Sequence, residues 1–371
     1  MHGRDIIVVG ASAGGVEALT GLICRLPAEL PAAVFVVLHI PAHSTSLLPA
    51  ILSRKGRLPA AHAIDGEAIT HGRIYIAPPD AHLLLRRGQV RLSRGPRENG
   101  HRPAVDPLFR TAGVTSGRRV VGVVLSGALD DGTAGLMAIK RRGGVAIVQD
   151  PEEALYGGMI RNALENVDVD QVLPVAEIAP ALVRLAREPV EEEGEDSVPD
   201  EMQREAEMAT LELGELQDPQ RPGTPSGFAC PECGGVLWEL REGELIRFRC
   251  RVGHAWTANS LLAEQSEALE SALWMALRAL EERAALSERL AERLRGRGHS
   301  LSAEKFAQQE DESRRMAEVL RQVLLSMQPA SDEVGSEAAG ASAETATGAS
   351  AETATGESAE TAAGERGASD G

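Results

Sequence analysis

The hydrophobic pattern begins with a short apolar run near the start of the chain. Residues 6–9 are four consecutive β-favouring residues, which is typical of a strand buried on both faces of a parallel sheet. Glycines between residues 10 and 15 then permit a tight turn, and residues 16–19 begin a helical pattern. This predicts a strand–turn–helix unit with Ser12 at the top of the turn, beside a helix N-terminus that stabilises negative charge.

Apolar runs and helical patterns alternate up to residue 187. Further strands are predicted at 33–38, 60–64, 73–78, 119–125, 145–148 and 171–173, and residues 83–92 form a predicted hairpin. Further helices are predicted at 47–54, 133–142, 159–164 and 178–187, with another that starts at Pro107 after Asp106 as N-cap. This alternation predicts an α/β fold with a doubly wound, mainly parallel sheet and helices on both faces.

The rest of the chain divides by composition into four segments after a first domain of residues 1–190. Residues 191–226 form an acidic linker with a short predicted helix, and residues 227–258 form a small cysteine-rich module. Residues 259–328 carry a helical pattern. Residues 329–371 repeat an acidic octet without large apolar residues, so we expect a disordered tail.

Apolar residues within 259–328 recur at helical spacing. One stripe contains Leu269, Leu273, Leu277, Leu280, Leu286, Leu290 and Leu294, and the other contains Met316, Leu320, Val323 and Met327. Glycines at 296 and 298 separate the two helices. The pattern fits an antiparallel helical hairpin or a dimerising coiled coil, and its apolar face either packs as a core or docks a signalling partner.

Charge and composition indicate which partners and which compartment the protein is expected to have. Residues 1–190 contain 21 Lys and Arg against 18 Asp and Glu, whereas the remaining residues contain 17 against 37. This acidic second half argues against nucleic acid as its partner. Because no apolar run approaches the ~20 residues of a membrane span, we expect no membrane insertion. The start of the chain lacks a signal peptide pattern, so we expect a cytoplasmic protein.

Three polar residues follow the ends of predicted buried strands, namely Ser12, His39 and Asp131. Because the carboxyl ends of parallel strands share one edge of a sheet, a hydroxyl, an imidazole and a carboxylate are expected on one rim. A glycine-rich turn is also typical of dinucleotide binding, but a dinucleotide binder usually ends its second strand in an acid. His39 stands there instead, which favours a nucleophile site. Each residue taken singly is also compatible with a helix cap or a core-edge side chain.

Motifs along residues 5–187 resemble those of CheB-type chemotaxis protein-glutamate methylesterases. They are Gly10 to Gly15, Leu38 to Ala42, Tyr75 to Pro78, His101 to Asp106, and Ser126 to Gly132. The resemblance implies a serine hydrolase that demethylates glutamate methyl esters on the cytoplasmic helices of methyl-accepting chemoreceptors and releases methanol. It also implies that receptor glutamines are deamidated by some members, and that catalysis needs no cofactor.

The resemblance assigns a role to each rim residue. Ser12 corresponds to the nucleophile, His39 to the base and Asp131 to the orienting acid. Asp130 is the rival acid, but the family's aspartate directly precedes glycine, as Asp131 does. His82, His101 and Arg102 also fall in family-like segments and are interpreted as site-lining or structural.

Two departures from the family pattern favour an alternative, in which the fold is kept as an inactive scaffold or binding module. No receiver domain precedes residue 6 in this chain, so we expect the family's control by phosphorylation to be missing. The family's glycine-methionine-glycine-asparagine run is replaced by residues 127–130 (Gly-Ala-Leu-Asp).

Cysteines and a histidine in residues 227–258 have the spacing of metal ligands. They are Cys230, Cys233, Cys250 and His254. Three thiolates and one imidazole are a closed tetrahedral set, which predicts a structural zinc; unliganded reduced cysteines are the alternative. We expect these ligands to lie outside the catalytic fold, so that residues 1–190 work without them. Cys24 is interpreted as a buried core residue.

Overall fold

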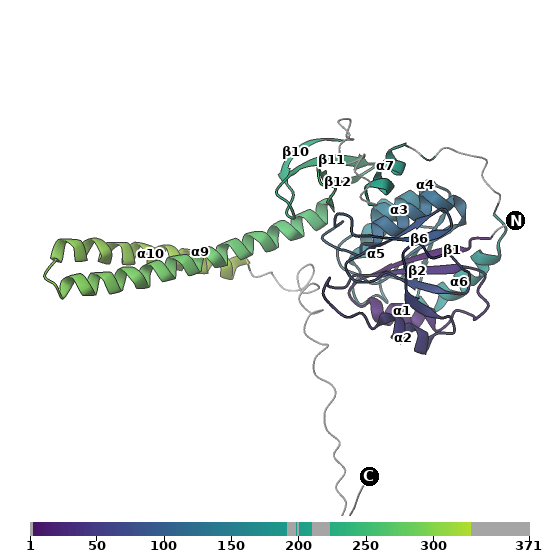
Figure 1. The fold of residues 1–371 in the computed structure, drawn as a ribbon, viewed down its shortest axis with the longest axis horizontal. Coiled ribbons are helices and arrows are strands. Elements are labelled where there is room, and N and C mark those ends of the chain that lie inside the picture. Colours follow the sequence, from purple (N-terminus) through teal and green to yellow (C-terminus); the bar gives the residue numbers. More distant parts are fainter. Residues whose placement is uncertain (1–2, 191–197, 199, 210–222, 328–371) are drawn as a thin grey trace, which may run out of the picture.

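The computed structural model describes residues 3–190, 198, 200–209 and 223–327 (Figure 1). The first part is a seven-stranded sheet in the order β3-β4-β2-β1-β7-β8-β9, and every neighbouring pair is parallel. Its strands are β1 (Ile6–Ala11), β2 (Ala33–Leu38), β3 (Ala60–His62), β4 (Ile74–Ile76), β7 (Val120–Val124), β8 (Val145–Gln149) and β9 (Gln171–Leu173). The predicted α/β fold with a parallel sheet is confirmed.

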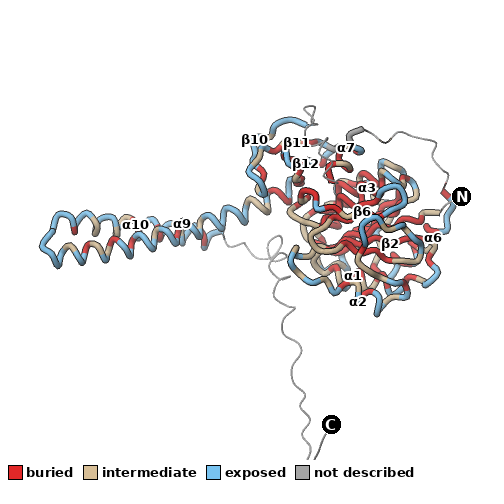
Figure 2. The backbone as a smooth tube through the Cα atoms, in the orientation of Figure 1, coloured by how far each residue is buried: buried red, intermediate tan, exposed pale blue. Residues whose placement is uncertain are grey.

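Side chains of the central strands alternate between two cores, as the two-residue period of a strand requires. Ile7 and Val9 of β1 pack in the core beneath one group of helices, and Ile6 and Val8 pack in the other. The first core is covered by α1 (Gly15–Ile23), α2 (Leu48–Lys55) and α6 (Val175–Arg187). The second is covered by α3 (Val105–Ser116), α4 (Thr133–Arg141), α5 (Gly158–Asn166) and the hairpin of β5 (His82–Arg86) and β6 (Gln89–Ser93). Figure 2 shows the buried sheet between these layers.

The chain reverses its direction of travel through the sheet at β1. It leaves β1 for β2 on one side and later returns to β7 on the other, so β1 pairs with both. Open α/β sheets form their ligand sites outside the carboxyl ends of strands at such a switch point. The segments that follow β1, β2 and β7 therefore meet at one edge.

A second, antiparallel sheet follows the short helix α7 (Asp200–Met208). Its strands β10 (Thr224–Ala229), β11 (Val236–Glu242), β12 (Leu245–Cys250) and β13 (Ala255–Thr257) pair in chain order. We call this sheet, residues 224–257, the Cys/His module. It encloses a small core that includes Leu237, Phe248 and Trp256, and it lies against the α/β domain beside α7 (Figure 1).

Two long helices project from the Cys/His module as an antiparallel hairpin (Figure 1). They are α9 (Ala258–Arg295) and α10 (Ser300–Met327). Their buried seam is narrower and richer in small residues than predicted, with Leu277, Ala284 and Ala291 on α9 and Ala303, Ser313, Ala317 and Leu324 on α10.

Of the predicted second stripe, Leu320 packs against the seam, but the other three residues do not lie in it. Met316 is 56% exposed, Val323 is 38% exposed and Met327 is 37% exposed. The seam residues Ser313 and Ala317 were not recognised because small and polar residues give a weak hydrophobic signal, and the buried Leu324 was also missed. Large apolar side chains on the outside of the hairpin, such as Trp274 and Met275, are exposed.

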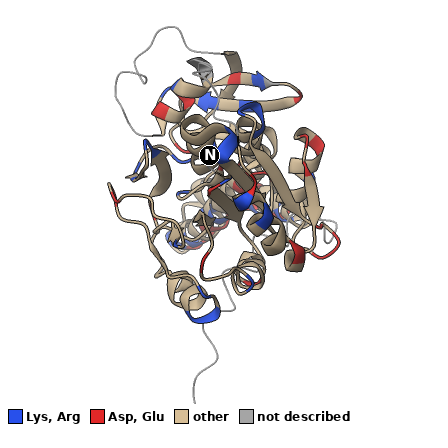
Figure 3. Ribbon diagram, turned by 90° about the vertical axis from the view of Figure 1, so that its right-hand side faces the viewer, with Lys and Arg blue, Asp and Glu red and all other residues tan. Residues whose placement is uncertain are grey.

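Other predictions have mixed outcomes. Cys24 follows α1 and is exposed, so its assignment to the core was wrong. Acidic and basic residues are interspersed over the described chain (Figure 3). None of the helices in the described ranges combines the length and apolarity that a bilayer crossing requires. The predicted acidic tail and most of the linker lie outside the described residues.

Candidate active site

Ser12 lies in the turn between β1 and α1, at the carboxyl edge of the sheet. Its backbone N–H donates to the carbonyl of Ser126 after β7 (3.0 Å), and its own carbonyl accepts from the N–H of Gly15 (2.9 Å). Gly14 has a φ of 69°, the left-handed region that glycine adopts without steric penalty. The first bond ties the turn to the segment after β7, the second closes the turn, and the Ser12 side chain is half-buried on the rim.

His39 immediately follows β2 and bridges the other two rim residues. Its Nδ1 lies 3.1 Å from Ser12 Oγ, and its Nε2 lies 2.7 Å from Asp131 Oδ2. Both partners are satisfied by the tautomer whose Nε2–H donates to Asp131 while Nδ1 accepts from the Ser12 hydroxyl. Only 6% of the His39 side chain is exposed, so the imidazole is shielded from most competing water.

Asp131 lies in the loop between β7 and α4 and is almost fully buried. Burial alone would raise the pKa of Asp131, but the hydrogen bond from His39 and the His39 charge outweigh it, so the pKa lies below its ordinary value. Backbone amides complete its shell: Oδ2 accepts from Val105 N–H (2.6 Å), and Oδ1 accepts from Asp106 N–H (3.2 Å). The carboxylate is therefore held as a fixed anion facing the imidazole.

Asp130, the rival acid, faces away from His39. Its Oδ1 accepts a hydrogen bond from the Thr257 hydroxyl (2.6 Å) at the end of β13. Burial raises the pKa of Asp130 to about 6, although the hydrogen bond from Thr257 opposes the shift. The structure thus brings Asp131, and not Asp130, together with Ser12 and His39.

His101 is stacked on His39, with ring centroids 3.7 Å apart. Burial, followed by the charge of His39, lowers the pKa of His101 to about 3, so its ring is neutral at pH 7. A neutral ring packs against the His39 imidazole without charge repulsion. His101 therefore lines the site and fixes the plane of His39.

The other two family-like residues have structural contacts. His82 is buried; its Nε2–H donates to the Pro96 carbonyl (2.9 Å) and its Nδ1 accepts from Ala104 N–H (3.3 Å). Arg102 forms an ion pair with Asp80 (2.6 Å). Both side chains brace the loop that carries His101.

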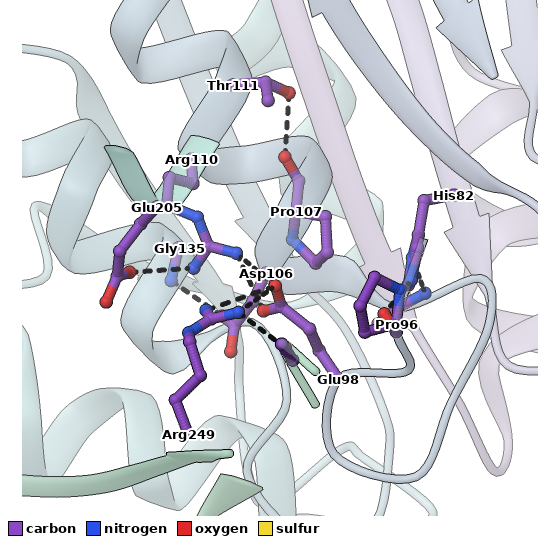
Figure 4. A network of polar contacts seen from close by, with 12 residues as sticks. His82, Pro96, Glu98, Asp106, Pro107, Arg110, Thr111, Gly135, Glu205 and Arg249 are labelled. Atoms are coloured by element: carbon purple, nitrogen blue, oxygen red, sulfur yellow. Dashed lines mark hydrogen bonds and ion pairs between the residues drawn. The ribbon is translucent and has the colours of Figure 1, made fainter. Parts of the chain in front are cut away.

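Asp106 does not cap α3 as predicted. The helix begins two residues earlier than predicted, at Val105, and Asp106 lies in its first turn. Its Oδ1 accepts from the N–H groups of Gly132 (3.0 Å) and Gly135 (2.7 Å) at the start of α4, so it caps the neighbouring helix (Figure 4). Burial, and then the negative charge of Asp131, raise the pKa of Asp106 well above its ordinary value.

Buried ion pairs join the α/β domain to the Cys/His module (Figure 4). Glu98 forms two short hydrogen bonds with Arg110 of α3 (2.6 and 2.7 Å) and an ion pair with Arg249 of β12 (3.3 Å). Glu205 of α7 pairs with Arg247 of β12 (2.9 Å) and with Arg110 (3.3 Å). The metal ligands lie outside the catalytic fold, but the module that carries them packs against it, and the expectation that residues 1–190 work alone stays a prediction.

The predicted metal ligands come together in one cluster. The ligand atoms of Cys230, Cys233, Cys250 and His254 all lie within 4.8 Å of one another. Cys233 Sγ is 3.6 Å from Cys250 Sγ, and His254 Nδ1 is 3.5 Å from Cys250 Sγ. Tetrahedral zinc with bonds of ~2.3 Å to sulfur places sulfurs about 3.8 Å apart, so the spacing fits a metal and is too long for a disulfide.

Sequence reasoning missed the polar residues that surround Asp131 from outside the rim. Asn99 Nδ2 donates to Asp131 Oδ1 (3.0 Å), and Asn99 Oδ1 accepts from Thr257 N–H (3.0 Å) and from Ser260 Oγ (3.0 Å). Thr257 lies 158 residues after Asn99. No spacing rule in a single sequence links positions so far apart.

Comparison with known proteins agrees with this geometry. A family model described as CheB methylesterase matches residues 7–182. A putative protein-glutamate methylesterase/protein-glutamine glutaminase of Leptospira interrogans is 38% identical over 189 residues, which are 51% of this chain and 98% of that protein. The chain belongs to the CheB methylesterase family.

Other members of the CheB methylesterase family are similar over the same half of the chain. Protein-glutamate methylesterase/protein-glutamine glutaminase 2 of Anaeromyxobacter dehalogenans is 42% identical over 183 residues, 49% of this chain and 54% of that protein. The chain thus spans about half the length of such relatives. The crystal structure of the Thermotoga maritima CheB methylesterase catalytic domain is 35% identical, with a TM-score of 0.47, and the match covers 49% of this chain and 98% of that chain.

Proposed function

We propose that this protein is a serine hydrolase that removes methyl groups from glutamate methyl esters of methyl-accepting chemotaxis receptors. The products are receptor glutamate and methanol. The observation that carries the proposal is the chain of contacts from Ser12 Oγ to His39 Nδ1 (3.1 Å) and from His39 Nε2 to Asp131 Oδ2 (2.7 Å). The relatives named for both activities also support deamidation of receptor glutamines at the same site.

The distances support one role for each of Ser12, His39 and Asp131. His39 Nδ1 removes the hydroxyl proton while Ser12 Oγ attacks the ester carbonyl, and Asp131 stabilises the imidazolium that forms. The imidazolium then returns its proton to the departing methoxide, which leaves as methanol. Water, deprotonated by His39, hydrolyses the resulting acyl-Ser12 ester and restores the enzyme.

The start of α1 supplies donors for the negative charge that develops on the carbonyl oxygen. Within the described chain, the backbone N–H groups of Ala13 and Gly14 have no hydrogen-bond acceptor, and they lie directly beside Ser12 at the helix N-terminus. Free amides at a helix N-terminus stabilise an oxyanion. We assign them to the tetrahedral intermediate.

The substrate and the setting follow from the family. The partners proposed are the cytoplasmic helices of methylated chemoreceptors, and the compartment proposed is the cytoplasm, where free thiols such as those of the Cys/His module stay reduced. Catalysis requires no cofactor, since nucleophile, base and oxyanion donors all come from this chain.

The test is methanol release from receptor that has been methylated with labelled methyl groups. The full chain is expected to release methanol, and Ser12→Ala and His39→Ala are each expected to lower the rate by at least about 10³-fold. Cys24→Ser, an exposed change away from the site, is the control and should match the unaltered protein. A folded full chain that releases no methanol above background, and whose Ser12 is not labelled by a fluorophosphonate, would support the scaffold alternative instead.

We also propose that the Cys/His cluster binds one structural zinc ion. Its support is the set of three thiols and one imidazole at tetrahedral spacing, with no position left open for a substrate. Metal analysis should find about one zinc per chain, and Cys250→Ser should lose it while Cys24→Ser keeps it. Retention of full zinc content by Cys250→Ser would refute this assignment.

A further inference from the structure

A loop of the α/β domain, residues 97–101, forms backbone hydrogen bonds with β13 of the Cys/His module. Asn99 N–H donates to the Ala255 carbonyl (2.8 Å), and Ala255 N–H donates to the Arg97 carbonyl (3.2 Å). Glu98 and Ala255 form a parallel β-bridge. The loop also carries His101, which is stacked on His39. One short segment therefore contacts both the candidate site and the module.

The Asn99 side chain extends this connection into the site. Its amide nitrogen donates to Asp131 Oδ1 (3.0 Å) and to Asp106 Oδ2 (3.2 Å), and its amide oxygen accepts from the module side. Because one end of the amide donates and the other accepts, these partners fix its orientation. Asn99 is only 6% exposed, so water does not replace the partners readily.

Thr257 and Ser260 hold the other end of Asn99. They form the capping box that begins α9, in which each side chain accepts from the other's backbone N–H. Ser260 Oγ donates to Asn99 Oδ1 (3.0 Å), and Thr257 Oγ1 donates to Asp130 (2.6 Å). The module thus contacts the loop of Asp131 in two ways, through Asn99 and through Asp130.

We propose that the Cys/His module and the first turn of α9 are part of the active site, with Asn99 as a positioning residue that Ser260 and Thr257 hold against Asp131. The inference rests on the proposed function only for its substrate, because the reactivity of Ser12 can be measured with a small probe. The α/β domain supplies the triad. The module supplies the contacts that set the orientation and the charge of Asp131, the acid of that triad.

Loss of the Asn99 contact has a definite chemical consequence. The amide donor offsets part of the negative charge on Asp131, which also faces His39, His101, Asp106 and Asp130. Without that donor, more of the negative charge on Asp131 is left uncompensated, which favours positive charge beside it, so the reaction at Ser12 requires a higher pH. The acid limb of a pH–rate profile therefore moves to higher pH, which simple loosening of the loop would not cause.

Because of the ion pairs at the interface, the contact of Ser260 can be removed without undocking the module. Glu98 with Arg249, and Glu205 with Arg247, hold the module on the α/β domain independently of Ser260. Ser260→Ala removes one hydroxyl and leaves these pairs intact, so the variant is expected to stay folded with the module docked. Ser266→Ala is the matched control, because Ser266 lies on the same helix, is exposed, and bonds only to the Leu262 carbonyl of its own helix.

The experiment measures the rate at which a fluorophosphonate modifies Ser12 in the full chain between pH 5 and pH 9. Asn99→Ala should lower the rate at pH 7 about 10–100-fold, as is usual for residues that orient a reacting group, and Ser260→Ala should lower it by a smaller factor. The double variant should be no slower than Asn99→Ala alone, because Ser260 acts through Asn99. Both single variants should shift the acid limb to higher pH, and Ser266→Ala should match the unaltered chain.

Other results would overturn the inference. The module would be shown not to act on the site if Ser260→Ala reacted with the probe at the rate of the unaltered chain. The same would follow if the rate losses of Asn99→Ala and Ser260→Ala multiplied in the double variant, or if both variants were slower but had an unshifted pH–rate profile. A full chain that reacts with the probe and shows the expected variant effects, yet releases no methanol from methylated receptor, would refute the proposed substrate and support the inference.

Discussion

Two groups of buried carboxylates lie near one another in this protein and are stabilised in different ways. Glu98 and Glu205 form ion pairs with arginines. Asp106, Asp130 and Asp131 accept hydrogen bonds from backbone amides, a hydroxyl, an amide side chain or His39. The first group joins two parts of the molecule, and the second surrounds the candidate site.

The two sets of carboxylates also differ in the direction in which their pKa values are shifted. Burial opposes ionisation in both, but the arginines outweigh it and lower the pKa of Glu98, and they lower the pKa of Glu205 to about 2. Without such cations, burial raises the pKa of Asp130 to about 6. Of Asp106, Asp130 and Asp131, Asp131 is the one with a lowered pKa, and His39 is the main reason. An acid that must stabilise a transient imidazolium works best when no permanent cation competes for it.

The largest expected effect comes from neutralising the acid of the site. Asp131→Asn should lower methanol release by about 10⁴-fold, because an amide favours the wrong tautomer of His39. Thermal stability at pH 7 should fall as well, because the lowered pKa of Asp131 means that its ionised carboxylate stabilises the folded state above about pH 4. Asp130→Asn is the matched control in the adjacent position and should retain most activity. Near-normal turnover by Asp131→Asn would contradict the role given to this carboxylate.

Neutralising Glu98 or Glu205 should lower the free energy of unfolding more than it lowers the rate of methanol release. Glu98→Gln leaves Arg249 without its charged partner and should lower the free energy of unfolding by about 3–5 kcal/mol, measured by urea denaturation. Glu152→Gln, at an exposed position, is the control and should change it by less than about 0.5 kcal/mol. An unfolding free energy equal to that of the unaltered chain would show that the ion pairs do not hold the interface.

A smaller effect, with a defined pH dependence, is expected at Asp130. Its folded pKa of about 6 lies above the ordinary value of 3.8, so the folded state binds the proton more tightly. The resulting stabilisation is complete below pH 3.8 and is lost as the pH rises through 6. Asp130→Asn should therefore be more stable than the unaltered chain by about 1–3 kcal/mol at pH 7, with a difference that shrinks toward pH 4. A difference that stays constant from pH 4 to pH 7 would contradict the raised pKa.

Much of the fold and the rim could be predicted because local patterns determine them. Doubly apolar runs indicated the central strands, and the shared carboxyl edge of a parallel sheet indicated that Ser12, His39 and Asp131 would meet. The Cys/His cluster followed from ligand spacing alone. In each case the informative residues are close in sequence or are related by a general rule of sheet topology.

The remaining features depend on tertiary contacts that have no local pattern. Asp106 looked like a cap for its own helix but caps α4, because the start of that helix packs against it. The seam of the helical hairpin uses alanine and serine, which carry little hydrophobic signal. The module was expected to be independent, because nothing in the sequence shows that Arg249 pairs with Glu98 or that Ser260 contacts Asn99.

The backbone bonds between residues 97–101 and β13 also fix the order in which the protein matures on the ribosome. All strands of the α/β sheet have left the peptidyl-transferase centre when residue 187 has been added, but β13 and Ser260 come about 70 residues later. At ~5–20 residues per second, this leaves an interval of roughly 4–15 seconds. During it, a nascent chain can already fold the sheet and assemble Ser12, His39 and Asp131, yet Asn99 still has no partner for its amide oxygen. On the proposed role of Asn99, the full reactivity of Ser12 is expected only after the second sheet has been translated.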